Sequence, residues 1–313
     1  MYPFKRILVP TDFSLCAEAA FSHALYLGQR YKAEVHLLHV APPSARGSHA
    51  EATDEIEWPD KITEPRPGMP AYTEHWQDLP LRRAIVHHAD PVTAILTYAG
   101  EQAIDFIVMG AHGDRGAGHF LNLGVESSFL GHTAEQVVRH AGCPVLRVVM
   151  PNGRSPERIR RLLAPVDGSS LSLLALAYAK DMAALYDARL ALLHVLPPRS
   201  STAGGEDAAV SEEQARHDLV EAFNKTRGPD VSAGFYVARG RPDRMIRTFV
   251  EKHRVDLVIM GAHSDLGQDV LGIVTERVVR KAPCPVLTVR RGKSDPKASA
   301  RARRTSPIPV VFL

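Results

Sequence analysis

Two apolar runs that end in glycine stand out in the hydrophobic pattern of the chain. The first lies in residues 104–114 (IDFIVMGAHGD), and the second follows 151 residues later in 255–265 (VDLVIMGAHSD). A continuous β-rich run of this kind is typical of a strand buried on both faces, as in a parallel sheet. The loop after such a strand leaves its carboxyl end, where open α/β sheets place their ligands. We therefore expect any small-molecule site at this loop, in both copies.

Further segments recur in the same order, so the chain is a tandem repeat. Residues 7–14 (ILVPTDFS) match 162–169 (LLAPVDGS), and residues 132–148 match 273–289. Ordered matches of this kind indicate two homologous domains of similar size. The predicted organisation is a first domain at 1–150, a linker rich in Pro, Gly and Arg at 151–161, a second domain at 162–291, and a basic, disordered tail at 292–313.

Within each domain, strand-like runs alternate with helical stretches. Ser14 and Ser169 are placed to cap a first helix that presents one apolar stripe. Five strands joined by crossover helices predict an α/β fold of two repeated doubly wound domains, each with a five-stranded parallel sheet flanked by helices. Beside the strand at 7–10, its counterpart and the two central runs, the expected strands are 34–40, 81–87, 143–146, 189–195, 231–238 and 284–287, and the expected last helices are 134–140 and 275–281.

The region between the second and third strands differs between the copies. In the second domain, residues 210–227 form a plausible amphipathic helix. The first domain has prolines scattered from 42 to 80, and this density cannot continue a long helix. At most a short helix near 71–78 is expected there.

Composition and charge narrow the class of protein. The 313 residues are 45% hydrophobic and 23% charged, as in ordinary globular proteins. A net charge of +3 is too small to indicate a nucleic-acid-binding protein. The chain lacks a long uncharged apolar run, so no membrane span is expected, and its first residues offer no signal-peptide core. Three cysteines without paired spacing fit a reducing compartment, and the expected location is the cytoplasm.

The motifs of both halves resemble those of the universal stress protein family. The first set is PTDFS, MGAHG and GHTAEQVV before CPVL, and the second is PVDGS, MGAHS and GIVTERVV before CPVL. The resemblance implies a dimeric or tandem α/β protein that is induced under stress. It also implies a link to ATP, which some members bind. In those members the first-strand Asp and its neighbours hold the adenosine, the backbone after the second strand contacts adenine, and a G-x2-G-x9-G-[S/T] loop cradles the phosphates.

These roles, carried over by resemblance, fall on one set of candidate cofactor-binding residues in each domain. The first set is Pro10, Thr11, Asp12, Val40, Met109, Gly110, His112, Gly113, Gly131, His132 and Thr133. The second set is Pro165, Val166, Asp167, Val195, Gly261, His263 and Gly272.

Both phosphate loops depart from the family pattern. In the first, 17 residues instead of 9 precede Gly131, and His132 takes the hydroxyl position, although Thr133 and Gln136 form a capping-box pattern for the helix that follows. In the second, Ser264 replaces a glycine, 7 residues precede Gly272, and Ile273 replaces the hydroxyl residue. A Cβ restricts φ, and isoleucine has no donor for a phosphate.

The sequence therefore favours a regulatory or interaction protein of the stress response with degenerate nucleotide loops. The alternative is an ATP-binding stress sensor that uses the first domain, with slow hydrolysis as a by-product. Asp12 and Asp167 have a second interpretation, since an acidic residue at a strand-to-helix turn also bonds the first helical amides. No nucleophile–base–acid set recurs, so no enzyme is predicted, and the histidines lack the spacing of a metal site.

The sheet edges and the C-terminal tail of the chain indicate which partners to expect. The fifth strands are expected to pair the domains as an intramolecular pseudo-dimer, because an apolar sheet edge needs covering, and higher homo-oligomers and an unknown protein partner stay open. No membrane partner is expected. The four basic residues of the tail do not outweigh its short, Pro- and Ser-rich composition, so nucleic acid is not favoured. Whether the final IPVVFL docks on the body or on a partner stays open at this point.

Overall fold

The computed structural model describes residues 4–43, 78–113, 130–150, 159–198, 211–262, 271–290 and 310–312. The chain divides into two compact units. Pro3–Glu157 with Arg291–Leu313 is called the first domain below, and Arg158–Arg290 with Met1–Tyr2 is called the second domain.

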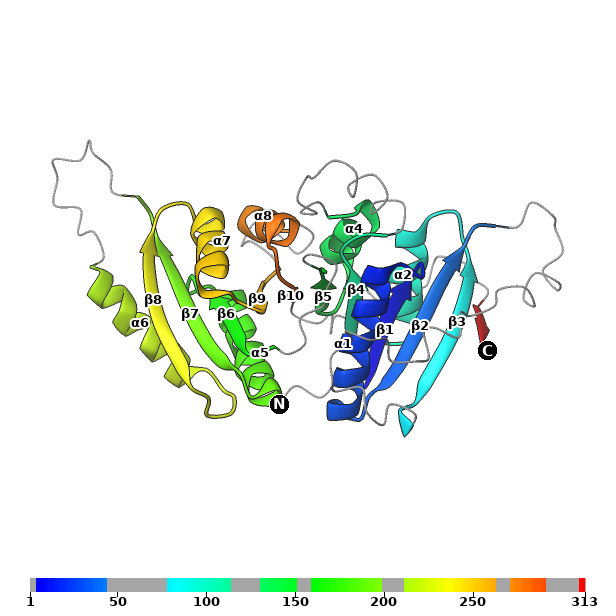
Figure 1. The fold of residues 1–313 in the computed structure, drawn as a ribbon, viewed down its shortest axis with the longest axis horizontal. Coiled ribbons are helices and arrows are strands. Elements are labelled where there is room, and N and C mark those ends of the chain that lie inside the picture. The colour runs from blue at the N-terminus through cyan, green and yellow to red at the C-terminus, as the bar shows by residue number, and fades with distance from the viewer. Residues whose placement is uncertain are drawn as a thin grey trace. The chain divides into compact units, whose positions relative to one another are not determined.

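The first domain is a doubly wound α/β unit (Figure 1). β1 pairs in parallel with both β2 and β4, so the strand order reverses beside β1. The strands run in the order β11-β3-β2-β1-β4-β5, and all pairs except β11–β3 are parallel. Its elements are β1 (Arg6–Thr11), α1 (Leu15–Tyr31), β2 (Glu34–Ala41), β3 (Leu81–His87), α2 (Pro91–Glu101), β4 (Phe106–Gly110), α4 (His132–His140), β5 (Val145–Val148) and β11 (Val310–Phe312).

The second domain repeats this plan with five parallel strands in the order β8-β7-β6-β9-β10. The predicted fold class is therefore confirmed in both halves. Its elements are β6 (Arg161–Pro165), α5 (Ser170–Tyr186), β7 (Arg189–Leu196), α6 (Glu212–Lys225), β8 (Ala233–Arg239), α7 (Pro242–His253), β9 (Leu257–Gly261), α8 (Ile273–Lys281) and β10 (Val286–Val289).

Helices cover both faces of the first sheet. Successive residues of a strand point to opposite faces. Gly28 of α1 lies against Val35 of β2, where an added Cβ would be 2.9 Å from Cγ2. The next residue, His36, instead meets Tyr98 of α2. Because β1 and β4 are covered on both sides, Ile7, Leu8, Ile107 and Val108 are fully buried, which explains their uninterrupted apolar runs.

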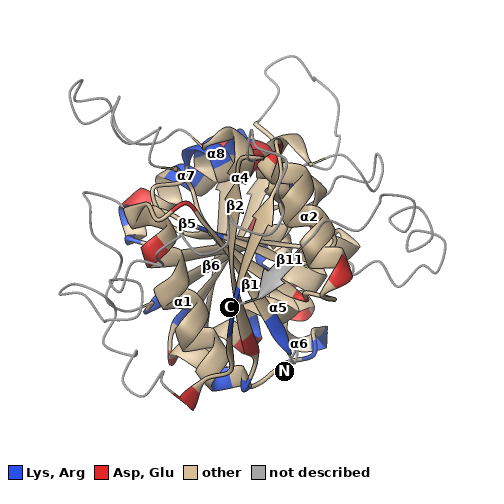
Figure 2. Cartoon of the chain, turned by 90° about the vertical axis from the view of Figure 1, so that its right-hand side faces the viewer, with Lys and Arg blue, Asp and Glu red and all other residues tan. Residues whose placement is uncertain are grey.

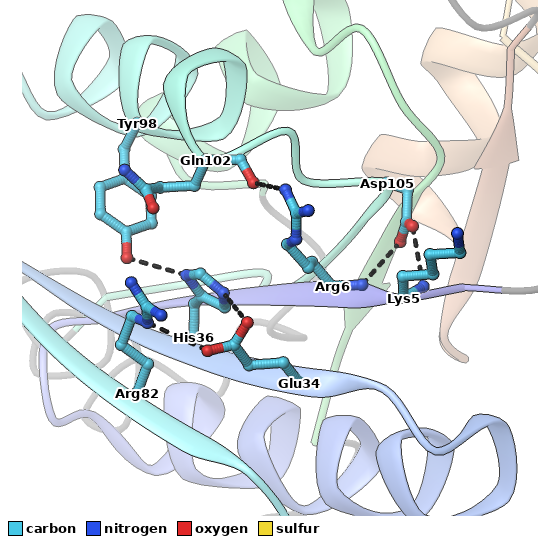
Figure 3. A network of polar contacts seen from close by, with 8 residues as sticks. All are labelled: Lys5, Arg6, Glu34, His36, Arg82, Tyr98, Gln102 and Asp105. Atoms are coloured by element: carbon cyan, nitrogen blue, oxygen red, sulfur yellow. Dashed lines mark hydrogen bonds and ion pairs between the residues drawn. The ribbon is translucent and has the colours of Figure 1, made fainter.

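An acidic residue before each central strand holds the start of the first strand. Asp105 accepts hydrogen bonds from the amides of Lys5 at 2.8 Å and Arg6 at 3.2 Å, as Figure 3 shows. Asp256 accepts from the amides of Arg160 and Arg161, both at 2.9 Å. The recurring Asp thus satisfies amides that begin a strand, and its role is structural.

Several predicted boundaries differ from the observed ones by one or two residues. The fifth strands begin at Val145 and Val286, two residues later than predicted. Proline has no amide hydrogen, so Pro144 and Pro285 contribute only their carbonyls, which accept from the amides of Ile107 and Val258. The predicted linker also extends too far, because Arg161 already belongs to β6.

The end of the tail also differs from the prediction. Residues 310–312 form β11, which pairs antiparallel with β3, whereas the tail at 292–313 was predicted to be disordered, with the docking of its apolar end left open. Backbone pairing at a sheet edge is available to any extended segment and leaves little trace in composition. The rest of the tail, His263 and all but the last residue of the short helix expected at 71–78 lie outside the described residues.

Acidic and basic residues are interspersed over the described helices (Figure 2). On α8, Arg280 pairs with Glu276 at 3.1 Å and Arg277 approaches Asp243 of α7 at 3.7 Å. Such pairs weaken the field that these helices present to a nucleic acid. None of the helices in the described ranges has the length and apolar character needed to cross a membrane.

Candidate functional site

The turn between β1 and α1 is held by its own side chains. Thr11 Oγ1 accepts from the amide of Phe13 at 3.0 Å, and Asp12 Oδ1 accepts from the amide of Ser14 at 3.2 Å. Ser14 then caps α1, as predicted, by accepting from the amide of Ala17 at 3.3 Å. Phe13 has a φ of 63°, which a non-glycine residue keeps only when its surroundings hold it. The turn presents the exposed carboxylate of Asp12 at the carboxyl end of β1.

Two glycines of the first loop lie in close contact with this turn. An added Cβ at Gly110 would lie 2.8 Å from the carbonyl carbon of Cys16, in the first turn of α1. At Gly113 it would lie 2.3 Å from Asp12 Oδ2. The hydroxyl of Ser14 also donates to the carbonyl of His112 at 3.4 Å. A side chain at Gly110 would clash with the backbone of α1, and one at Gly113 would displace the Asp12 carboxylate, so the two glycines allow the loop after β4 to lie beside Asp12.

The helix after the loop begins at the same place. The amide of Gly131 donates to the carbonyl of Ala111 at 2.8 Å, and an added Cβ at Gly131 would lie 3.2 Å from that oxygen. Gly131 is the N-cap of α4, and no side chain in the described part of the chain caps this helix. Its first amides therefore point outward near Asp12 and Gly113, and such amides favour an anion.

The predicted capping box at this helix is wrong. Thr133 lies inside the first turn of α4 rather than at its cap. The reason is that the carbonyl of Gly131 accepts from the amide of Glu135 at 3.0 Å and so starts the helix two residues earlier. The side chain of His132 is exposed at the first helical position, where it adds no cap but lies beside the free amides.

A histidine holds the end of the first strand in both domains. Nδ1 of His39 lies 2.9 Å from the carbonyl oxygen of Thr11, and Nδ1 of His194 lies 2.7 Å from that of Val166. A carbonyl only accepts, so Nδ1 carries the hydrogen in both rings. Phe13 stacks on His39 with ring centroids 4.6 Å apart. The matching positions of these histidines thus reflect a shared hydrogen bond.

The corresponding turn of the second domain is similar in outline. Asp167 Oδ1 accepts from the amide of Ser169 at 2.9 Å, and Ser169 caps α5 by accepting from the amide of Ser172 at 3.2 Å. Gly168 between them has a φ of 82°. Burial raises the pKa of Asp167, but its hydrogen bonds with Ser169 and Ser172 outweigh burial and hold the pKa below the usual range. The structural interpretation of Asp12 and Asp167, as acceptors for turn amides, is thus observed.

The second phosphate loop is altered where the helix begins. Gly272 is the N-cap of α8, and its amide donates to the carbonyl of Ala262 at 3.2 Å. The next residue, Ile273, is 65% exposed. The hydroxyl of Thr275 donates to the carbonyl of Gly261 at 2.8 Å, so this buried hydroxyl is already engaged. An apolar side chain therefore stands at the helix end where a phosphate-binding loop needs a donor.

The structure places the two predicted sets at equivalent element ends of their domains. Around the carboxyl ends of β1 and β4 lie Thr11, Asp12, Gly110, His112, Gly113, Gly131, His132 and Thr133, while Pro10 and Met109 are buried in the strands just before them. Val40 is half-buried near the end of β2. In the second domain, Pro165, Val166, Asp167, Val195, Gly261 and Gly272 occupy the equivalent element ends.

Sequence analysis missed the side chains that tie these elements to one another. Ser14 bonds the carbonyl of His112, Thr275 bonds that of Gly261, and Phe13 packs on His39. The only signal available was a hydroxyl residue near each helix start, which the capping role already explained.

Other reactive groups near the site do not suggest catalysis. Burial raises the pKa of the Cys16 thiol, and this keeps it protonated and unreactive. A search of the described residues finds no group of three or more His, Cys, Asp or Glu side chains that could hold a metal ion.

Comparisons with known proteins agree with the repeat. The model of the universal stress protein family matches residues 3–148 and again 158–290. A universal stress protein of Methanocaldococcus jannaschii is 30% identical over 162 residues, which cover 47% of this chain and 84% of that protein. One from Mycobacterium tuberculosis strain H37Rv is 29% identical over 208 residues, or 64% of this chain and 66% of that protein.

A solved structure shows the same two-part fold. A proposed universal stress protein from Pseudomonas aeruginosa superposes with a TM-score of 0.65 at 18% identity, over 96% of this chain and 98% of that one. At this identity the likeness concerns the fold alone. The two family matches cover most of the sequence, one in each half, and the chain therefore belongs to the universal stress protein family as a tandem member with two family domains.

Proposed function

We propose that this protein is a stress-response regulator that binds one adenine nucleotide, in its first domain. Membership of the family supports a stress-response role. The observation that carries the nucleotide part is the position of Gly113, where a Cβ would lie 2.3 Å from the carboxylate of Asp12. This contact places a glycine-lined backbone, an exposed acceptor and the free amides of α4 at one corner of the sheet.

The ribose and the phosphate of a nucleotide fit two neighbouring parts of this site, the Asp12 carboxylate and the start of α4. The carboxylate of Asp12 can accept hydrogen bonds from ribose hydroxyls, and its own turn keeps it in place through Ser14. The amides of His132 and Thr133, in the first turn of α4, provide donors and a positive helix end for a phosphate. The His132 ring adds one N–H donor when neutral and a positive charge when protonated, and both favour an anion.

The second domain supports nucleotide binding far less well. Asp167 has the same turn as Asp12, but Ile273 brings an exposed apolar side chain to the start of α8. Desolvating phosphate oxygens against it would cost free energy without a compensating hydrogen bond. The expected stoichiometry is therefore one nucleotide per chain.

A second candidate function is a protein-interaction scaffold with no nucleotide, and the same residue favours it. Exposed large apolar side chains are common singly, yet Ile273 is 65% exposed at the loop where other domains of this fold place ligands. In this case the second domain would contact a protein partner through the start of α8.

Isothermal titration with Mg-ATP distinguishes these functions. The wild-type chain is expected to show one saturable site. Gly113→Ala forces the Asp12 carboxylate to turn away and should weaken binding about tenfold or more, equivalent to roughly 1.4 kcal/mol. Gly100→Ala is the matched control, because nothing lies within 4 Å of its added Cβ.

His132→Asp adds a second, independent variant, since a negative charge beside the amides of α4 opposes phosphate. Two equivalent sites would mean that the second loop still binds. No heat change with the wild-type chain, at protein concentrations well above the micromolar range, would rule out the nucleotide proposal and leave the scaffold.

A further inference from the structure

The last described strand of the chain lies on the edge of the first domain's sheet. β11 pairs antiparallel with β3, with Val310 opposite Val86, Val311 opposite Ile85 and Phe312 opposite Ala84. We propose that the outer edge of β3 is a strand-binding site, which holds this chain's own C-terminal residues and accepts the same residues from a second copy. The second copy would then be joined to the first by exchange of β11.

The covered half of β3 is the half that most needs a partner. Ala84, Ile85 and Val86 are almost completely buried, whereas Arg82 and Arg83 in the first half are partly exposed. An edge strand exposes a row of amides and carbonyls, and charged side chains are one of the devices that protect such an edge. β11 pairs with the apolar residues Ala84, Ile85 and Val86, and the two arginines lie in the other half of the strand. The cap and the charges therefore protect complementary parts of one edge.

The second domain provides an internal comparison. β8 occupies the position of β3 in the repeat and is the outermost strand of its sheet among the described residues. None of its seven residues is fully buried, and Tyr236 is exposed. β8 is thus an outermost strand that carries no such cap among the described residues, and its side chains are more exposed than those of Ala84, Ile85 and Val86 beside β11. The strand-binding site belongs to the first domain alone.

The β11 segment is suited to detach from the edge of β3. It consists of three residues, and a pairing this short is marginally stable by itself. It is attached through residues 291–309 to the end of the second domain's last strand, a connection that can span roughly 65 Å when extended. Segments of this kind open at a small fraction of the free energy of global unfolding.

A second copy of the chain is the partner that fits the vacated edge best. Its residues 310–312 would restore the same register opposite Ala84, Ile85 and Val86, so every backbone bond lost in one chain is regained in the other. Exchange of an identical element is a low-cost route to dimers for this reason. A long connection allows the segment to reach a neighbouring molecule, and high protein concentration favours the exchange.

Disulfide trapping tests the pairing in the full-length chain. Val86→Cys with Val310→Cys places two thiols on directly opposed residues, and Cα atoms of such antiparallel pairs lie about 4.5–5.5 Å apart, within the range of a disulfide. Arg82→Cys with Val310→Cys is the matched control, because residue 82 lies four positions out of register. In dilute solution, only the Val86 pair should form an intramolecular disulfide. An equal yield from both pairs, or none from the Val86 pair, would overturn the proposal.

The same variant then tests exchange. Oxidation after incubation at high protein concentration should convert a substantial part of the Val86 pair into covalent dimers, which reducing agent returns to monomers. As a second measurement, a fluorescent peptide of residues 306–313 should bind a chain truncated after residue 305 and bind the full-length chain at least tenfold more weakly. A peptide with Val311→Pro, which lacks one amide donor, is its control. If only intramolecular disulfides form at all protein concentrations, exchange with a second copy is wrong. If the peptide binds the truncated and the full-length chain equally well, the edge of β3 is not its binding site.

Discussion

The hydroxyl of Tyr98 on α2 lies 2.9 Å from Nδ1 of His36 on β2, deep in the first domain (Figure 3). The other ring nitrogen of His36 lies 3.3 Å from Glu34 Oε2, at ion-pair distance but without good hydrogen-bond geometry, and Arg82 donates to the same carboxylate at 3.0 Å. Burial lowers the pKa of His36 although Glu34 opposes this, so the ring is neutral at pH 7. Glu34 is ionised and only accepts, so Nε2 carries the hydrogen and Tyr98 donates to Nδ1.

Removing the hydroxyl should destabilise the first domain. In Tyr98→Phe, the buried Nδ1 of His36 loses this donor, and the cost of leaving it unsatisfied is about 1–3 kcal/mol. Burial raises the pKa of Tyr98 to about 12, so the group stays a donor over the whole working range. Urea unfolding of Tyr98→Phe, His36→Leu and the double variant measures the coupling. Strictly additive losses would contradict the hydrogen bond.

The fully buried His23 of α1 makes stability depend on acid pH. Burial lowers its pKa to about 4, while the unfolded chain keeps a value near 6.5. The unfolded state therefore binds more protons between these values, and the free energy of unfolding should fall by up to roughly 3 kcal/mol as the pH drops from 6.5 to 4.

His23→Leu should flatten this dependence, whatever its effect at neutral pH. His217→Leu, at an exposed position of α6, should retain the slope of the wild-type chain. Thermal unfolding across this pH range gives the comparison, and parallel profiles for wild type and His23→Leu would refute the assignment.

Lys180 ties α5 to the end of α6 in the second domain. Its Nζ donates to the carbonyls of Thr226 at 3.0 Å and Phe223 at 3.4 Å, and lies 4.3 Å from the centre of the Phe223 ring. A cation at a helix C-terminus satisfies carbonyls and complements the dipole. Lys180→Met keeps the volume but loses the donor, and should cost about 1–3 kcal/mol. Hydrogen exchange should show the loss of protection concentrated at the end of α6, whereas uniform loss would argue against this role.

Two helical glycines should respond oppositely to alanine. At Gly100 of α2 the added Cβ has nothing within 4 Å, so Gly100→Ala should stabilise by about 0.5–1 kcal/mol. At Gly28 of α1 the Cβ would lie 2.9 Å from both Leu79 Cδ2 and Val35 Cγ2, so Gly28→Ala should destabilise despite the gain in helix propensity. Chemical unfolding of both variants checks the signs, and equal signs would mean that packing at Gly28 relaxes freely.

The acidic residues of the two turns should differ in their effect on ATP. Asp12→Asn removes a charged acceptor at the proposed site and should weaken binding about tenfold or more, whereas Asp167→Asn should leave it unchanged. Asp167→Asn should instead lose stability, because Asp167 is more stable as the carboxylate that its hydrogen bonds favour. Calorimetry and unfolding on both variants separate these effects. Equal losses of affinity would place nucleotide in both domains.

Much of the local structure follows from short-range patterns. The serines at 14 and 169 cap α1 and α5 because a hydroxyl can reach an amide three residues on, whatever the rest of the chain does. The capping box predicted at Thr133 rested on the same kind of local pattern, but it was wrong. Ala111, twenty residues before Gly131, fixes that glycine as the N-cap, and no local pattern contains this contact.

By itself, the sequence determined the tandem α/β fold and the alternation of strands and helices within each repeat. Apolar periodicity and internal repetition are patterns in the order of residues, so they can be read directly from the sequence. The tertiary structure decided the contact of Gly113 with Asp12, the hydrogen bond between His36 and Tyr98, and the pairing of β11 with β3. Each joins residues from 62 to 228 positions apart, and such contacts depend on how packed elements bring side chains or edges together in space.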